Sequence, residues 1–213
     1  MTAAMPTLDG ETHQFVDLES LRMHVAEAGE GEPVLLLHGF PQHWWEWRKI
    51  IPQLAERYRV VCPDLRGAGW TEAPANGYDG DHLLADVVAL LDGLELDRVR
   101  LISHDFGAIL GHQLCLRHPQ RVTHHLALAG PPPYLRFNPR SLTVIWRLWF
   151  QPVIAAPIVG PFLLRSGNQK LARHLFYEFA DRDVWSGGED IEIFLTPLRE
   201  PARAHAGSRT STI

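Results

Sequence analysis

The stretch Val99-Arg-Leu-Ile-Ser-His-Asp-Phe-Gly107 decides the fold, because a buried strand, a sharp turn and a helix meet inside it. Residues 99–103 form an apolar run typical of a strand, and a helical pattern over residues 107–118 follows at once. A reactive residue with a small residue two positions away on each side is typical of a strained strand-to-helix turn. Here Ser103 and Gly107 are the small residues, and we predict that the turn lifts the Asp105 side chain above the sheet.

Strand and helix patterns alternate outward from this turn. Residues 11–17 and 21–28 predict an antiparallel hairpin. Continuous apolar runs predict strands buried on both faces, as in a parallel sheet, at residues 33–38, 59–64, 99–103 and 125–129. Helical patterns lie between them at residues 44–58, interrupted by Pro52, at 81–94, with Asp81 as N-cap, and at 107–118. This alternation predicts the α/β class, with a mostly parallel sheet flanked by helices.

The character of the sequence changes at three consecutive prolines, residues 131–133. We predict that residues 1–130 form the N-terminal part of an α/β core. Residues 131–205 are rich in Trp, Phe, Leu and Arg at helical spacing, which predicts a helical cap. Residues 206–213 are small and polar, and we expect an irregular tail there.

Composition excludes several classes of protein. The 213 residues are 46% hydrophobic and 21% charged, which is ordinary for a globular chain. The net charge of −5, without a basic stripe, argues against a nucleic-acid partner. The N-terminus lacks the pattern of a signal peptide. The longest apolar run, residues 153–164, is too short for a bilayer and contains two prolines, so we expect no firm membrane association.

Cysteine and histidine usage narrows the chemistry. Cys62 and Cys115 are the only cysteines, and both lie in apolar segments. A secreted disulfide framework needs more cysteines, so we expect two reduced thiols in a cytoplasmic protein. The 12 histidines show no metal-ligand spacing, and we expect neither a metal site nor a cofactor.

A carboxylate at the turn points to one class of reaction. The Asp105 carboxylate can attack a saturated carbon that carries a leaving group, which gives an alkyl–enzyme ester that water then hydrolyses. The backbone N–H of Phe106 should face the negative charge that develops there. The turn His38-Gly-Phe-Pro41 should aim a second N–H, that of Phe40, at the same place. The alternative interpretation is an ordinary turn in which Asp105 only caps the helix.

Two histidines flank this predicted site and are candidates for substrate contact. His38 could serve as a base, but a structural histidine that bonds the backbone of its turn is the favoured interpretation. His104 precedes the nucleophile, and we expect it to point away from it. In the segment Asp64-Leu-Arg-Gly-Ala-Gly69 we expect a tight turn with an Asp64–Arg66 interaction, which is structural rather than catalytic.

Three segments resemble one family in their order and spacing. They are His38-Gly-Phe-Pro41, Pro63-Asp-Leu-Arg-Gly67 and His104-Asp-Phe-Gly107. With them the chain resembles the epoxide hydrolases and their dehalogenase relatives in the α/β-hydrolase superfamily, over residues 11–204. The resemblance implies that Asp105 is the nucleophile and that Phe40 and Phe106 supply the oxyanion-hole N–H groups. It also implies a cis peptide bond before Pro41.

Within that superfamily the resemblance favours the epoxide hydrolases. Haloalkane dehalogenases carry Trp after the nucleophile, and fluoroacetate dehalogenases carry arginines there and three residues on, whereas Phe106 and Ile109 are apolar here. Epoxide hydrolases use cap tyrosines that donate to the epoxide oxygen. The segment Leu148-Trp-Phe-Gln151 resembles a cap segment with such a tyrosine but places Trp149 at its position, so Tyr134 and Tyr177 are further candidates. For Tyr177 the favoured interpretation is packing inside the cap with Phe176 and Phe179. The partners implied are a small apolar epoxide and water.

The resemblance also implies that parts of the fold are missing. In the family a histidine after the last strand activates water, and an acid after an earlier strand orients it. Here residue 213 is reached as the cap ends, so we expect the C-terminal strands and helices of the core, and the histidine with them, to be missing. His205 lies in a flexible part of the chain and is not favoured as the base. We therefore expect a truncated member that forms the ester but turns over poorly, with an exposed sheet edge that favours homo-oligomers.

Two alternatives remain open at this point. One is a haloalkane dehalogenase-like hydrolase, which would release halide. The other is a non-catalytic, truncated protein of hydrolase fold that binds apolar ligands or a partner chain, and whose binding would not depend on Asp105.

Overall fold

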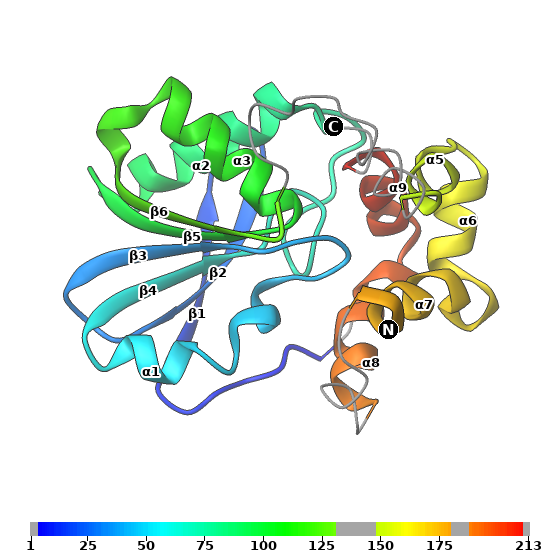
Figure 1. The fold of residues 1–213 in the computed structure, drawn as a ribbon, viewed down its shortest axis with the longest axis horizontal. Helices are drawn as coiled ribbons and strands as arrows, with labels where there is room; N and C mark the ends of the chain where they lie inside the picture. The colour runs from blue at the N-terminus through cyan, green and yellow to red at the C-terminus, as the bar shows by residue number, and fades with distance from the viewer. Residues whose placement is uncertain (1–3, 131–147, 180–187, 211–213) are drawn as a thin grey trace, which may run out of the picture.

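A six-stranded sheet forms the centre of the molecule in the computed structural model, which describes residues 4–130, 148–179 and 188–210 (Figure 1). Its strands are β1 (Glu11–Asp17), β2 (Arg22–Ala28), β3 (Glu32–Leu37), β4 (Tyr58–Pro63), β5 (Val99–His104) and β6 (Val122–Leu128). Their spatial order is β1-β2-β4-β3-β5-β6. Strand β2 pairs antiparallel with β1 and β4, and the pairs from β4 to β6 are parallel. The predicted α/β class and hairpin are confirmed.

Helices cover both faces of this sheet. The turn η1 (Trp44–Trp47) and α1 (Ile51–Ala55) lie on one face (Figure 1). Helices α2 (Gly80–Gly93) and α3 (Phe106–Arg117) lie on the other, and the turn η2 (Pro119–Arg121) leads into β6. Strand β3 contributes Leu35 and Leu37 to the α2–α3 side and Val34 and Leu36 to the α1 side. Because side chains alternate along a strand, an unbroken apolar run fills both cores.

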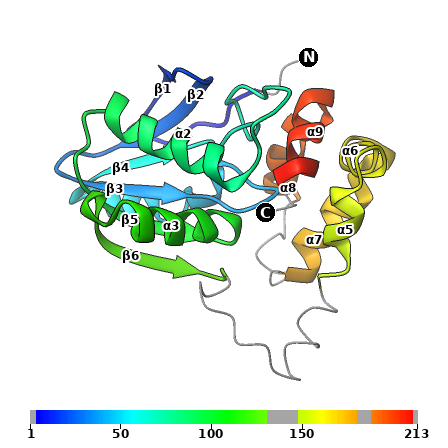
Figure 2. The ribbon, with the colours of Figure 1, turned by 90° about the horizontal axis from the view of Figure 1, so that it is seen from above.

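A second group of helices, the helical layer, lies beyond the carboxyl ends of the parallel strands, toward which β3 and β6 point in Figure 2. Its elements are α5 (Phe150–Ala155), α6 (Val159–Arg165), η3 (Gly167–Gln169), α7 (Lys170–Phe179), α8 (Glu189–Leu195), η5 (Pro197–Arg199) and α9 (Pro201–Thr210). The layer has its own buried core, which includes Leu164, Phe176 and Phe194. Phe40 and Trp45, from the segment after β3, pack against that core. The layer therefore sits over the sheet edge at which β5 ends.

Two helix boundaries differ from the sequence-based expectation. The helix expected over residues 44–58 is divided into η1 and α1, and Pro52 stands in the first turn of α1, where proline is tolerated. The N-cap of α2 is Asp79 rather than Asp81, because an Asp79 Oδ1 accepts the His82 N–H at 3.1 Å.

The expected irregular tail is wrong for residues 206–210, which belong to α9. Ala206 and Ser208 are only 1% and 2% exposed, and Ser208 Oγ donates to the Ile154 carbonyl at 2.6 Å. Small side chains let α9 approach α6 closely, so its low hydrophobicity conceals a buried helix. Residues 211–213 and the predicted boundary at residues 131–133 lie outside the described residues. No helix in the described ranges is long and apolar enough to cross a membrane.

Candidate active site

Asp105 occupies the turn between β5 and α3, where the sequence predicts a nucleophile. Its φ of 50° and ψ of −117° belong to neither helix nor strand, a conformation that non-glycine residues adopt only under constraint. The Asp105 N–H donates to the Leu128 carbonyl at 3.0 Å, which ties the turn to β6. A side chain at Gly107 would place its Cβ 2.4 Å from the Leu37 carbonyl oxygen, so only glycine fits there. Because the Asp105 side chain makes no capping bond to α3, the helix-cap interpretation is wrong.

The loop after β3 brings a backbone donor to this carboxylate. The Phe40 N–H donates to Asp105 Oδ2 at 3.0 Å. The Phe40–Pro41 peptide bond is cis, as the resemblance implies. Phe106 is the first residue of α3, so its N–H has no acceptor within the helix. The structure thus joins Phe40 to Asp105 and leaves the Phe106 N–H available at the same turn.

His104 and Glu46 form a charged pair beside Asp105. His104 Nδ1 lies 2.7 Å from Glu46 Oε1, and Glu46 Oε2 accepts the Gly39 N–H at 2.9 Å. Burial of the His104 ring acts to lower its pKa, but the contact with Glu46 and the charges of Glu46 and Asp105 outweigh burial, so the pKa is raised. Sequence reasoning missed Glu46. The signal that could have found it is a lone acid among the tryptophans of residues 44–47.

His38 makes the contacts of a structural histidine. It is 3% exposed, its Nδ1–H donates to the Gly39 carbonyl at 2.8 Å, and its Nε2 accepts the Leu65 N–H at 2.9 Å. With both ring nitrogens bonded to backbone, a neutral His38 has no polar atom left for a substrate. The geometry therefore favours the structural interpretation over substrate contact or general-base chemistry.

The expected Asp64–Arg66 interaction is wrong, because each residue has a different partner. Arg66 binds Asp86 through Nε at 2.7 Å and Nη2 at 2.8 Å. Asp64 is fully buried and accepts three hydrogen bonds, from His24 Nδ1 (2.7 Å), the Trp44 N–H (2.8 Å) and the Trp70 N–H (2.9 Å). Burial opposes its ionisation, but the charges of three neighbouring histidines and the bond from His24 hold the Asp64 pKa below its usual range. As a buried carboxylate, Asp64 therefore ties strand β2, the turn η1 and the loop at Trp70 together.

Two of the aromatic residues predicted to contact substrate, Trp149 and Tyr177, are exposed to solvent. Trp149 is 48% exposed, and its ring lies against those of Phe150 and His174. Tyr177, on α7, is 43% exposed and lies outside the core of the helical layer, so the interpretation that it packs inside the cap is not supported. Among the described residues, neither the Trp149 indole N–H nor the Tyr177 hydroxyl has a hydrogen-bond partner. Tyr134 lies outside the described residues.

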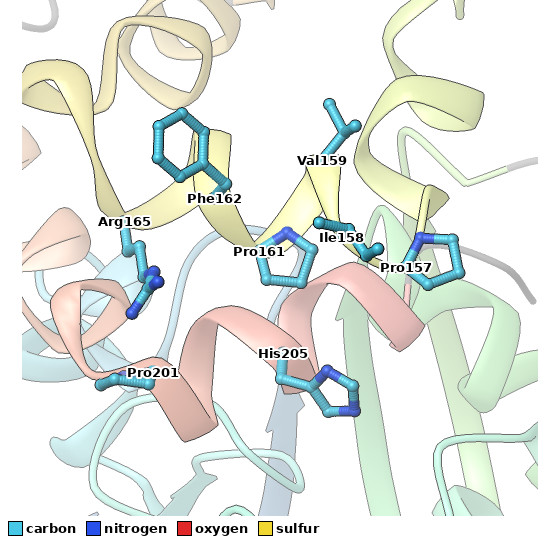
Figure 3. Close-up of a pocket in the computed structure, with 8 residues that line it drawn as sticks. All are labelled: Pro157, Ile158, Val159, Pro161, Phe162, Arg165, Pro201 and His205. Atoms are coloured by element: carbon cyan, nitrogen blue, oxygen red, sulfur yellow. The ribbon is translucent and has the colours of Figure 1, made fainter.

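The cavity beside the oxyanion loop is small, at about 40 Å³, and is lined by residues that include Phe40, Phe106 and Phe194. Such a volume holds a few water molecules, whereas organic ligands occupy several hundred Å³. A larger depression of about 400 Å³ lies between α6 and α9 (Figure 3). It is lined by Pro157, Ile158, Val159, Pro161, Phe162, Arg165, Pro201 and His205. His205 therefore faces this depression, which does not include Asp105.

Comparison with known proteins gives one consistent family. Residues 32–199 match the model of the family described as alpha/beta hydrolase fold. The chain is 47% identical over 96 residues to soluble epoxide hydrolase of Corynebacterium sp. (strain C12), a match that covers 45% of this chain and 34% of the relative. It is 32% identical over 208 residues to fluoroacetate dehalogenase of Burkholderia sp., which covers 92% and 67%.

A solved structure extends this likeness to three dimensions. The epoxide hydrolase VrEH1 from Vigna radiata matches with a TM-score of 0.77 and 31% identity, over 95% of this chain and 72% of that one. The chain spans about one third to just over one half of the length of several curated epoxide hydrolases that it matches.

Proposed function

The chain belongs to the α/β-hydrolase fold family, and from this premise we propose that it opens a small apolar epoxide through a covalent ester on Asp105. The observation that carries the proposal is the Asp105 carboxylate at the β5–α3 turn, with the Phe40 N–H on its Oδ2 at 3.0 Å. The names of relatives from Corynebacterium and Vigna radiata support the epoxide. The apolar side chains of Phe106 and Ile109 support an epoxide substrate further, because neither side chain can donate a hydrogen bond to a halide or a carboxylate.

In the first half-reaction, Asp105 Oδ1 attacks a carbon of the epoxide ring. The C–O bond of the ring breaks, and its electron pair goes to the epoxide oxygen, which takes up a proton and becomes a hydroxyl group. Trp149, Tyr134 and Tyr177 are the proposed donors to that oxygen. An indole N–H hydrogen-bonds but does not give up its proton, so a tyrosine or a water molecule supplies it.

In the second half-reaction, water attacks the carbonyl carbon of the ester. The intermediate carries its negative charge on Oδ2, which is where the Phe40 N–H already donates, and we propose the Phe106 N–H as the second donor. Collapse of the intermediate releases the diol and restores the Asp105 carboxylate. The attacking water must lose a proton to a base. Among the described residues, His104 is engaged by Glu46 and His205 lines the outer depression, so we propose that the ester forms faster than it is hydrolysed.

The two thiols support the proposed cytoplasmic location and leave Asp105 as the proposed nucleophile. Cys62 is buried, Cys115 is half-buried, and both are free. Burial raises the pKa of each thiol, so both are protonated near neutral pH and poorly nucleophilic.

The test is intact-protein mass spectrometry after exposure to styrene oxide, an apolar aryl epoxide. We expect one adduct per chain, mapped to Asp105 by proteolysis and released by mild base, as an ester should be. The Asp105→Asn variant should gain no adduct at this position, and it provides the matched control. A folded wild-type sample without adduct would contradict the proposal.

Two further measurements separate the alternatives. Halide release from a panel of chloroalkanes and fluoroacetate, dependent on Asp105, would favour a dehalogenase-like hydrolase. Saturable binding of an apolar ligand with no adduct, unchanged in Asp105→Ala, would favour a non-catalytic binding protein.

A further inference from the structure

One carboxylate, that of Glu46, contacts both segments of the candidate oxyanion hole. Its Oε2 accepts the Gly39 N–H at 2.9 Å, and its Oε1 lies 2.7 Å from His104 Nδ1. Gly39 directly precedes Phe40, and His104 directly precedes Asp105. The Glu46 side chain is 9% exposed, so water competes little for these contacts.

The oxyanion loop and the turn meet closely at this point. A Cβ on Gly39 would lie 2.7 Å from Asp105 Cβ and 3.1 Å from His104 Nδ1, so the Gly39 backbone lies directly against both residues. Because the peptide unit is planar, the orientation of the Gly39–Phe40 peptide fixes the direction of the Phe40 N–H. A hydrogen bond weakens steeply as its angle departs from linear, so a small rotation of this loop would remove the donor from Asp105 Oδ2.

The charges around His104 strengthen the contact. The charged groups that face its ring are Glu46 and Asp105, and together they raise its pKa against the effect of burial. When the ring is protonated, the His104–Glu46 contact joins opposite charges as an ion pair, with 2.7 Å between Nδ1 and Oε1.

We propose that Glu46 is a positioning residue for the reaction at Asp105: it ties Gly39 to His104 and thereby aims the Phe40 N–H at Asp105 Oδ2. The inference rests on the proposed function, since it assigns Glu46 a part in forming the ester. Glu46 does not touch the reacting atoms and acts through the loop.

The first test is the rate of ester formation with styrene oxide, followed by mass spectrometry over a range of epoxide concentrations. In Glu46→Ala we expect the maximal rate to fall about 10- to 100-fold, because the oxyanion donor is no longer held in line. The half-saturating concentration should stay unchanged, since the apolar contacts to substrate remain. Glu46→Gln keeps an acceptor for the Gly39 N–H and should recover most of the rate.

A second test does not depend on the chemistry. Hydrogen exchange of the Phe40 amide, followed by NMR, should speed up in Glu46→Ala and return toward the wild-type rate in Glu46→Gln. The matched control is Glu56→Ala, which removes an exposed acid directly after helix α1 and should change neither measurement. If Glu46→Ala does not fold, Glu46→Asp replaces it, because the shorter side chain does not reach the Gly39 N–H. Glu46→Asp is then compared with Glu46→Gln, which keeps the length of the side chain.

The outcomes are distinguishable from failure of the proposed function. If the wild type forms the ester and Glu46→Ala forms it at the same rate, this inference is overturned and the proposed function stands. No ester in the wild type would contradict the proposed function, and the Phe40 amide would then decide whether Glu46 positions the loop. Unchanged exchange of that amide overturns the inference in either case.

Discussion

His43 shows how a single buried ring joins the sheet to the helical layer. Its Nε2–H donates to the Ile193 carbonyl of α8 at 3.2 Å. The residue is 1% exposed, and burial lowers its pKa to about 4, against the opposing charge of Asp64 and the bond to Ile193. The ring is therefore neutral near pH 7, and this contact between the two parts of the molecule depends on that neutrality.

We predict that His43 makes the protein sensitive to mild acid. The unfolded imidazole binds a proton near pH 6.5 and the folded one only near pH 4, so the unfolded state binds more protons between these values. The contribution of His43 to the free energy of unfolding is fully present above pH 6.5. It falls as the pH drops toward 4, by roughly 3 kcal/mol at most. Urea unfolding measured from about pH 7.5 down to about pH 4.5 checks this.

The matched variant is His43→Gln, which keeps a side-chain donor for the Ile193 carbonyl but does not titrate. Its stability should change much less over the same range. His104 cannot imitate the effect, because its raised pKa gives stability that is lost as the pH rises above 6.5. If His43→Gln loses stability as steeply with falling pH as the wild type does, another group is responsible for the pH dependence.

Local patterns predict some residues of the site and not others. Asp105 and Phe40 were predictable because a strand, a small residue and a turn lie within a few positions of each. Glu46 and Asp64 were not, because their partners come from segments that only the strand order brings together: Glu46 meets His104 of β5, and Asp64 meets His24 of β2. A periodic pattern within one segment does not predict contacts between segments that lie far apart in the sequence.

The same distinction holds for whole elements. Strands β3 and β5 were predictable because burial on both faces requires an unbroken apolar run. Residues 206–210 of α9 were missed because the buried positions there are Ala206, Gly207 and Ser208, whose small size allows close packing without hydrophobic periodicity. A Cβ on Gly207 would lie 2.8 Å from the Phe40 ring, which explains a glycine inside this helix.

Gln169 holds the ends of two helices in the helical layer. It is 1% exposed, and its Nε2 donates to the Leu164 carbonyl of α6 at 2.9 Å and to the Leu195 carbonyl of α8 at 2.7 Å. The last carbonyls of a helix have no partner within it, so this one amide satisfies a buried group on each helix. Its own Oε1 accepts Arg199 Nε at 3.1 Å.

We predict that Gln169→Leu destabilises the protein by roughly 2–4 kcal/mol, because two buried carbonyls lose their donor. Hydrogen exchange should rise in α6 and α8 before it rises in the sheet. Gln151→Leu makes the same chemical change at an exposed site of α5 and should be nearly neutral. Equal stability of the two variants in urea unfolding would refute the role assigned to Gln169.

At the scale of the whole molecule, the oxyanion loop lies where two cores meet. Phe40 packs against the core between the sheet and helices α2 and α3, and also against the core of the helical layer. A change in how the layer sits on the sheet therefore reaches the Phe40 backbone, which carries the donor to Asp105. The sequence predicted both parts, but their contact depends on the close approach of α9.

Strand β6 stands at one edge of the sheet. Within the described residues β6 pairs only with β5, so no other strand of that part of the chain bonds the backbone groups on its other side. Leu126 and Leu128 on this strand are 53% and 39% exposed, and the strand contains no lysine, glutamate or proline of the kind that protects sheet edges. An edge of this composition is a template for pairing with a second chain.

We predict that the protein self-associates through β6 as its concentration rises, which sedimentation velocity would detect as a shift from monomer to larger species. Leu126→Lys should reduce the association, because a charge at the edge opposes both strand pairing and burial. Ile158→Lys is the matched control, since Ile158 is 84% exposed in the helical layer, far from the β6 edge in the chain. A protein that stays monomeric at all concentrations would contradict the prediction. So would association that Ile158→Lys abolishes and Leu126→Lys leaves intact, because the contact would then lie on the helical layer.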